Sequence, residues 1–241
     1  MLLETVKSIK TSVLDLIYPP QCIHCNEGLT NAQSLLCDVC ATMLHPLEPT
    51  HRCKYCFSEQ CCERTGCCTN CTSKAKVLSG CASVFDYIGP ASSIIKKMKY
   101  SDMPFLGKGV AAYMFAQFVK LEWPLPDIIV PIPLSLSHKV QRGYNQSALI
   151  ASELGNYLNR DVVNILKRRN DGYSQAGLKR YQRERLSQAA FQLKENIEII
   201  DKTVLLVDDV YTTGSTLNRS SEAICGGYPK HIYALTFCRA Y

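Results

Sequence analysis

Short apolar runs alternate with longer segments of helical periodicity from about residue 77 onward. Short apolar runs between turn residues are typical of buried strands, and apolar residues three and four apart are typical of helices. The pattern predicts strands over residues 79–87, 127–130, 161–166, 203–207 and 231–237. It predicts helices over 92–99, 109–121, 147–158, 179–190 and 215–223. This alternation favours an α/β fold, a parallel sheet with helices on both faces.

Residues 1–18 have a different pattern, in which charged residues interrupt the apolar ones. A secretory signal needs an uninterrupted apolar core, so none is predicted here. An amphipathic helix packed on the body is expected, and a helix lying on a membrane surface is the alternative. Its apolar positions are Leu2, Leu3, Val6, Ile9, Val13, Leu14 and Ile17. We expect no membrane span, because no apolar run is long enough for one.

Cysteines are clustered: eleven of the fourteen lie between Cys22 and Cys71. Two Cys-x-x-Cys pairs stand eleven residues apart, and the same arrangement recurs 31 residues later. Four thiolates at this spacing are typical of a tetrahedral zinc ribbon, so two structural Zn²⁺ sites are predicted. Disulfides and an iron–sulfur cluster are the alternatives, although a reducing cytoplasm disfavours disulfides. The predicted ligands are Cys22, Cys25, Cys37 and Cys40, then Cys53, Cys56, Cys68 and Cys71.

The second ribbon has alternative ligands, because Cys61, Cys62 and Cys67 are additional thiols inside its loop. Only the repeat period favours Cys68 over Cys67 as a ligand. Composition changes after the ribbons, where the strand and helix pattern begins. We therefore expect a helix and double zinc ribbon over 1–76 and a second domain over 77–241.

The most informative stretch is 204–217, where four apolar residues lead to Asp208 and Asp209 and then to a Thr-Thr-Gly-Ser-Thr loop. The acids are expected where the strand ends. A loop rich in hydroxyl and N–H groups at a helix N-terminus favours phosphate, and Gly214 allows close backbone approach. Carboxylates repel phosphate, so the acids are expected to hold sugar hydroxyls or a metal.

Two other interpretations of this stretch are possible. A Walker B strand also ends in acids, but it requires a Gly-x-x-x-x-Gly-Lys-Ser/Thr partner. The sequence has none, since the Gly-Lys at Gly107 lacks both the upstream glycine and the hydroxyl. A purely structural strand, turn and helix is the other alternative.

Further basic and glycine-containing segments follow the strand at 127–130. Pro131 and Pro133 stiffen a turn, and Arg142 and Gly143 open an Arg-Gly-Tyr-Asn-Gln loop that suits a second phosphate group. A third segment runs from Gln-x-x-Leu at 175–178 through Arg183 and is strongly basic. Its simpler interpretation is a solvated helix face.

Residues 204–217 resemble the phosphoribosyl pyrophosphate (PRPP) motif of type I phosphoribosyltransferases. Together with the paired Cys-x-x-Cys knuckles, Pro-x-Pro, Arg-Gly-Tyr-Asn-Gln and Gln-x-x-Leu, the ordered set resembles the ComF family of competence proteins along nearly the whole chain. One departure is Leu186, where the family usually has Asn, which puts that polar contact in doubt.

The resemblance implies a type I phosphoribosyltransferase-like sheet that binds PRPP with Mg²⁺. Asp208 and Asp209 would face the ribose at the catalytic centre, and Arg142 with Lys99 would face the pyrophosphate, with Arg183 nearby. The 5′-phosphate would lie against Thr212, Thr213, Gly214, Ser215 and Thr216. Whether transferase activity is retained, and on which acceptor, stays open, because no nucleobase-reading motif is present.

The resemblance also implies a cytoplasmic role with incoming single-stranded DNA and other competence proteins. A net charge of +6 permits contact with an acidic polymer without requiring it. The alternatives are a catalytically inactive nucleic-acid-binding adaptor that uses its ribbons and basic segments, or an active phosphoribosyltransferase with a metabolic acceptor.

Overall fold

The computed structural model describes residues 20–31, 34–62, 65–72, 77–168, 190–195 and 197–240. The predicted helices over 1–18 and 179–190 lie outside the described residues, apart from Ala190. So does the Gln-x-x-Leu segment with Arg183.

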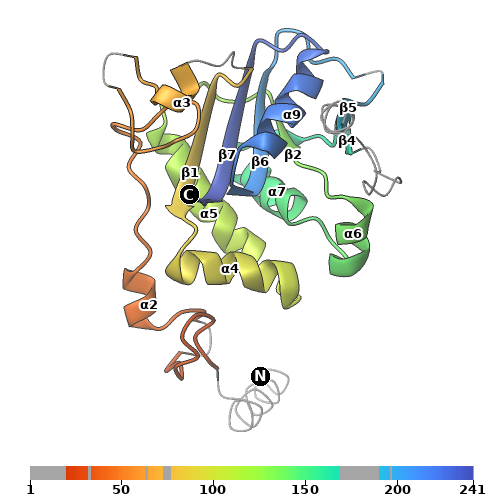
Figure 1. Cartoon of the computed structure of the whole chain (residues 1–241). Coiled ribbons are helices and arrows are strands. Elements are labelled where there is room, and N and C mark those ends of the chain that lie inside the picture. Colours follow the sequence, from red (N-terminus) through yellow and green to blue (C-terminus); the bar gives the residue numbers. More distant parts are fainter. Residues whose placement is uncertain are drawn as a thin grey trace, which may run out of the picture.

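A five-stranded, all-parallel sheet forms the centre of the molecule (Figure 1). Its strand order is β1-β7-β6-β2-β3, so the strand that carries the acids, β6, is central. The strands are β1 (Gly80–Asp86), β7 (His231–Arg239), β6 (Thr203–Tyr211), β2 (Ile128–Pro131) and β3 (Asp161–Val162). Because all strands are parallel, their carboxyl ends meet at one edge, where ligands of such sheets bind.

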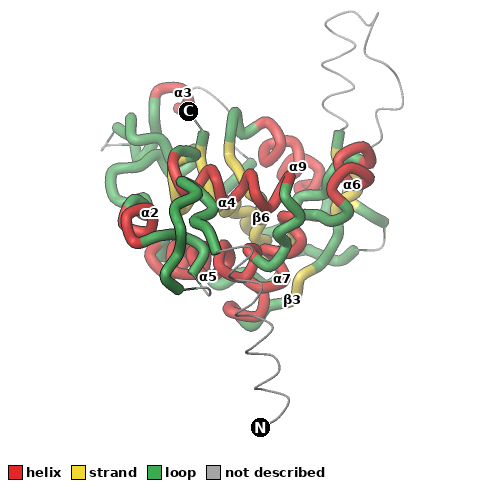
Figure 2. The backbone as a smooth tube through the Cα atoms, turned by 90° about the horizontal axis from the view of Figure 1, so that it is seen from below, coloured by secondary structure: helices red, strands yellow, loops and turns green. Residues whose placement is uncertain are grey.

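Helices cover both faces of the sheet, as the sequence predicted (Figure 2). Successive β6 residues alternate between the faces: Leu205 and Val207 belong to one buried cluster, Leu206 to the other. The first face packs on α4 (Gly89–Tyr100), α5 (Leu106–Lys120) and α7 (Gln146–Leu158). The second packs on α9 (Ser215–Cys225) and a small sheet of β4 (Leu166–Arg168) and β5 (Phe191–Leu193).

Three expectations about individual elements were wrong. Strand β6 does not end at the acids: it continues to Tyr211, which pairs with Arg239 of the equally long β7. The strand predicted over 161–166 is two strands, because β3 pairs with β2 whereas β4 leaves this sheet to pair with β5. Helix α6 (Leu136–Arg142) was not predicted; it has no buried residue, so it lacks the apolar periodicity that marks a helix.

The cysteine-rich region covers the outer edge of β1, the end strand of the sheet. Leu47 N donates to Val84 O (2.7 Å), and Cys81 N donates to Lys54 O (2.7 Å). Each ribbon ends in a short helix, α2 (Asp38–Thr42) or α3 (Thr69–Thr72). Figure 1 shows α2 near the carboxyl ends of the strands, beside α4, and α3 towards the opposite end of β1. None of the described helices has the length and hydropathy to cross a membrane.

Candidate functional site

The two acids of β6 lie where α4 and α7 meet the carboxyl edge of the sheet. Asp209 Oδ1 is 2.9 Å from Lys99 Nζ, and both side chains are largely buried. Asp208 Oδ1 accepts hydrogen bonds from Ser147 Oγ (2.8 Å) and from Asp209 N (2.9 Å). Lys99 comes from the last turn of α4 and Ser147 from the first turn of α7. The acids are therefore fixed by two helices that precede them in the sequence.

The charge state of Asp208 is strongly shifted by its surroundings. Loss of hydration raises its pKa most, and the neighbouring Asp209 charge raises it further. The hydrogen bonds from Ser147 and Asp209 N lower the pKa but do not compensate, so its value is about 7. One of the two acids thus exchanges a proton near neutral pH, while the other is paired with a lysine.

Residues 212–216, called here the phosphate loop, follow directly after β6. Thr212, Thr213 and Ser215 are exposed, and Thr213 Oγ1 lies 2.8 Å from Ser215 Oγ. Gly214 has φ +75°, and a Cβ there would be 2.4 Å from Tyr211 Oη. Only glycine fits this position, because it needs both the left-handed backbone and the missing side chain. Helix α9 then begins at Ser215 and directs its N-terminal N–H groups toward this loop.

A cationic cavity of about 440 Å³ is connected to the acid pair through Lys99. Arg142 lies over the Tyr100 ring, 5.4 Å from its centroid, and Nη1 donates to Gln146 Oε1 (3.3 Å). Lys99 reaches both this cavity and Asp209. The lining residues are Lys99, Tyr100, Asp102, Gln141, Arg142, Gly143 and Tyr144. The structure therefore brings Lys99 and Arg142 to one cavity, which Lys99 connects to Asp209.

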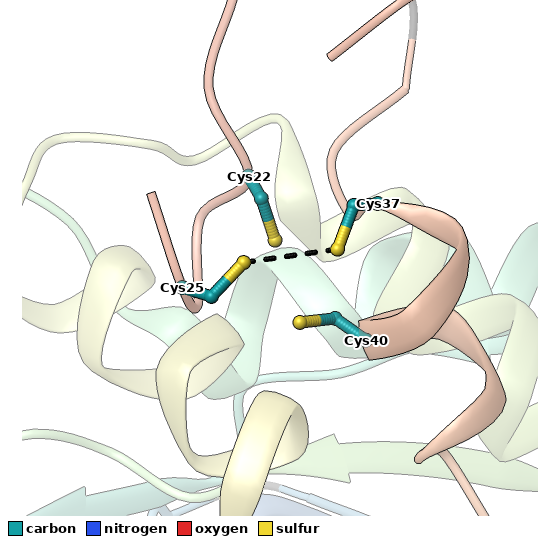
Figure 3. A group of neighbouring side chains, drawn as sticks. All are labelled: Cys22, Cys25, Cys37 and Cys40. Atoms are coloured by element: carbon teal, nitrogen blue, oxygen red, sulfur yellow. Dashed lines mark hydrogen bonds between the residues drawn. The ribbon is translucent and has the colours of Figure 1, made fainter. Parts of the chain in front are cut away.

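The first group of four cysteines has the geometry of a metal site (Figure 3). Tetrahedral zinc with Zn–S bonds of about 2.3 Å places its thiolates about 3.8 Å apart. Cys25 Sγ and Cys37 Sγ are 3.7 Å apart, and Figure 3 shows all four sulfurs converging on one point. The members are Cys22, Cys25, Cys37 and Cys40, whose sulfurs all lie within 4.8 Å of one another. This donor set and spacing fit Zn²⁺.

The second group consists of Cys53, Cys56, Cys68 and Cys71, with the same 4.8 Å limit. Cys56 Sγ and Cys68 Sγ are 3.6 Å apart. Cys67 lies outside the group, because its Sγ donates to Thr65 O (3.2 Å). The structure thus groups the cysteine that the repeat period favoured, and this donor set also fits Zn²⁺.

Backbone N–H groups point at the first sulfur of each cluster. Burial raises the pKa of Cys22, but N–H groups of Cys25, Cys37 and His24 outweigh burial and lower it to about 6. Burial likewise raises the pKa of Cys53, and N–H groups of Cys68, Tyr55 and Cys56 lower it to about 7. Thiolate is the form that binds metal, and the backbone supports it at these two sulfurs, whereas burial raises the pKa of Cys40 and Cys56.

Sequence reasoning missed two contacts at this site. Ser147, which holds Asp208, carried no signal beyond its position after the Arg-Gly-Tyr-Asn-Gln motif. Arg239 at the end of β7 lies over the Tyr211 ring and reaches the carbonyl of Cys56. Arg239 and Tyr211 border a cavity of about 300 Å³ between the second cysteine cluster and the phosphate loop. No sequence motif predicts that cavity, because the residues of its two walls are far apart in the sequence.

Comparison with known proteins gives a family match, a similar solved structure and curated relatives. The family described as "Phosphoribosyl transferase domain" matches residues 141–240, which include the acids and the phosphate loop. A purine phosphoribosyltransferase of Pyrococcus horikoshii is similar in structure at 18% identity and a TM-score of 0.34, over 53% of this chain and 68% of that one.

Two curated relatives match over most of their lengths. "DNA utilization protein YhgH" of Salmonella typhi is 27% identical over 71% of this chain and 77% of its own. "Competence protein F" of Haemophilus influenzae is 31% identical over 85% of this chain and 90% of its own. With its phosphoribosyltransferase domain and two four-cysteine clusters, this chain belongs to the ComF family of competence proteins.

Proposed function

We propose that the protein binds PRPP together with Mg²⁺ at the carboxyl edge of its sheet. The observation that carries the proposal is a series of neighbours: the phosphate loop directly follows β6, β6 carries the paired acids, and Lys99 joins Asp209 to the cavity that it shares with Arg142. PRPP has the same order, a 5′-phosphate, a ribose and a pyrophosphate. Asp208 and Asp209 would accept hydrogen bonds from the ribose hydroxyls, and the two cations would face the pyrophosphate.

Mg²⁺ fits this ligand because it prefers oxygen donors and keeps several waters while it binds phosphates. The acids and the pyrophosphate oxygens supply such donors. If transfer occurs, the sugar carbon becomes cationic as pyrophosphate leaves, and nearby carboxylates would stabilise that charge. Release of pyrophosphate from PRPP, with and without nucleobases, tests whether transfer accompanies binding.

The binding test is a calorimetric titration of PRPP with Mg²⁺ into the intact protein. We expect Asp209→Asn and Asp208→Asn each to weaken binding by roughly ten- to a hundredfold, the effect of losing one or two charge-assisted hydrogen bonds. Asp127→Asn is the matched control. Its carboxylate accepts from Thr203 N (2.7 Å) at the opposite end of β6, so PRPP binding should not change. Equal binding by the wild type and both site variants would refute the assignment.

We further propose that the protein supports the handling of incoming single-stranded DNA in the cytoplasm. The names of the relatives, competence protein F and DNA utilization protein, motivate this role. Tyr100 is 67% exposed beside Arg142, an arrangement on which a base can stack. Clusters of thiolates also need reduced cysteines, which the cytoplasm maintains. Retention of single-stranded DNA that does not weaken with salt, or with Tyr100→Ala, would count against it.

A further inference from the structure

We propose that the second cysteine cluster and the phosphate loop are energetically coupled through Arg239 and Tyr211. Zinc at the cluster and PRPP at the loop would then each strengthen the binding of the other. The inference rests on the proposed function for the identity of its ligand. Arg239 acts here as a positioning residue, because it connects the two sites.

The first contact joins the cluster to β7. Arg239 is 9% exposed, and its Nη1 donates to the carbonyl oxygen of Cys56. Cys56 is a predicted zinc ligand, so metal bound to its sulfur would fix the backbone that carries this carbonyl. A metal-free knuckle has fewer constraints and would hold the guanidinium less firmly.

The second contact joins β7 to the end of β6. The Arg239 guanidinium lies 5.3 Å from the centroid of the Tyr211 ring. The two residues pair in the parallel ladder, and Ala240 N donates to Tyr211 O (2.7 Å). The stacked guanidinium therefore restricts the Tyr211 ring from one side.

The third contact joins Tyr211 to the phosphate loop. The Oη of Tyr211 lies so close to Gly214 that a Cβ there would be only 2.4 Å away. Any rotation of this ring changes the space available to Gly214 at the start of α9. The position of the Cys56 carbonyl is thus transmitted through two side chains to the backbone that we expect to hold the 5′-phosphate.

The cavity of about 300 Å³ supports the same connection, because the two sites share its walls. Cys56, Cys68 and Cys71 line one side, and Thr212 and Thr213 line the other. Figure 2 shows α3 and α9 on the same side of the strands. The first cluster makes a different contact: His24 Nδ1 lies 2.9 Å from Ser93 Oγ of α4.

Thermodynamic linkage makes the effect measurable from either site. If zinc raises PRPP affinity by some factor, PRPP raises zinc affinity at the second cluster by the same factor. We expect a factor of about ten, within the usual range for coupled sites. The affinity of the first cluster for zinc should not respond.

The experiment measures zinc affinity on the full chain by competition with a zinc-selective chelator, with and without PRPP and Mg²⁺. Alkylation of freed thiols, read by mass spectrometry, assigns each lost zinc to one cluster. The first cluster is then an internal control in the same sample. Titration of PRPP into fully and partly zinc-loaded protein measures the reciprocal effect.

Three variants test the route. Arg239→Met removes the donor to Cys56 and the stacked cation, so the coupling factor should fall to about one. Arg52→Met is the matched control: Arg52 Nη1 donates to Phe57 O (3.1 Å) in the same knuckle, but its other bonds go to Glu48 and Glu59. It should weaken zinc binding and leave the coupling factor unchanged. Tyr211→Leu replaces Arg239→Met if that variant does not fold.

Each outcome decides a different point. A wild-type coupling factor of one, with PRPP bound, overturns the inference and leaves the proposed function intact. Undiminished coupling in Arg239→Met or in Tyr211→Leu overturns the route. If the wild type binds no PRPP, the proposed function fails, and amide hydrogen exchange at residues 211–216 tests the connection alone. Zinc removal should then speed exchange in the wild type but not in Arg239→Met, and unchanged exchange in the wild type overturns the inference.

Discussion

Asp208 is the residue whose charge most directly affects the proposed ligand. Its pKa is raised to about 7, mainly by loss of hydration and then by the Asp209 charge. The ionised carboxylate can accept hydrogen bonds at both oxygens, whereas the protonated form carries a hydrogen on one of them. PRPP affinity should therefore rise as the pH increases from 6 to 8. The ionised fraction grows about tenfold over that range for a pKa near 7. Calorimetric titrations at pH 6, 7 and 8 measure this rise.

The phosphates of PRPP titrate in the same interval, so Asp208→Asn is the control. In the variant, the pH dependence of binding comes from the PRPP phosphates and no longer from the Asp208 side chain. Equal slopes of affinity against pH in the wild type and the variant would refute the prediction.

The pH dependence that Asp208 gives to protein stability has the opposite sign. Because the folded pKa lies above the ordinary 3.8, the folded state holds this proton longer than the unfolded state. The contribution of Asp208 to the free energy of unfolding therefore falls as the pH rises from about 4 to 7.

At the scale of elements, α7 depends on the cap that Asn145 provides. Asn145 Oδ1 accepts from Ser147 N (3.1 Å), and its Nδ2 donates to Ile132 O (2.9 Å) after β2. Asn145→Ala should reduce the free energy of unfolding by about 1 to 2 kcal/mol. It should also weaken PRPP binding, because Ser147 loses its fixed position beside Asp208. Chemical denaturation and calorimetry measure the two effects.

Ser135→Ala is the comparison for that prediction. Ser135 caps α6 in the same way, accepting from His138 N (3.3 Å), but α6 has no buried residue. Its loss should cost little stability, since an exposed helix contributes few packing contacts. A larger effect at Ser135 than at Asn145 would contradict this account.

The sequence predicted those elements whose residues are buried on a regular period. Helix α7 and strand β7 follow such patterns, and their predicted bounds differ from the observed ones by one or two residues. The acids and the phosphate loop also lie at the expected edge. The prediction that the strand ends at Val207 was wrong, because pairing with β7, and not the local sequence, determines where β6 ends. Contacts such as Cys56 with Arg239, 183 residues apart, carry no local signal.

At the scale of the whole molecule, the cysteine-rich region completes the core of the sheet domain. Ile23, Leu47 and Phe57 belong to the same buried cluster as Phe237 of β7. Gln117 of α5 donates to Leu47 O (2.8 Å), and the backbone of residues 47 and 54 pairs with the β1 edge. The division into 1–76 and 77–241 stays a prediction. These contacts make us expect that the second part does not reach full stability without the first.

A fragment of residues 77–241 should therefore unfold at a lower denaturant concentration than the intact chain and associate through β1. Removing the ribbons uncovers the Val84 carbonyl and the Cys81 amide, and an open edge strand is a template for pairing with another chain. Denaturation and light scattering measure both effects. Leu47→Pro in the intact chain is the comparison: it removes the bond to Val84 O and the buried Leu47 side chain but leaves the rest of the ribbons in place, so it should lower stability less. A fragment that stays monomeric and as stable as the intact chain would show that the sheet domain needs neither ribbon, and that the ribbons fold against a complete surface.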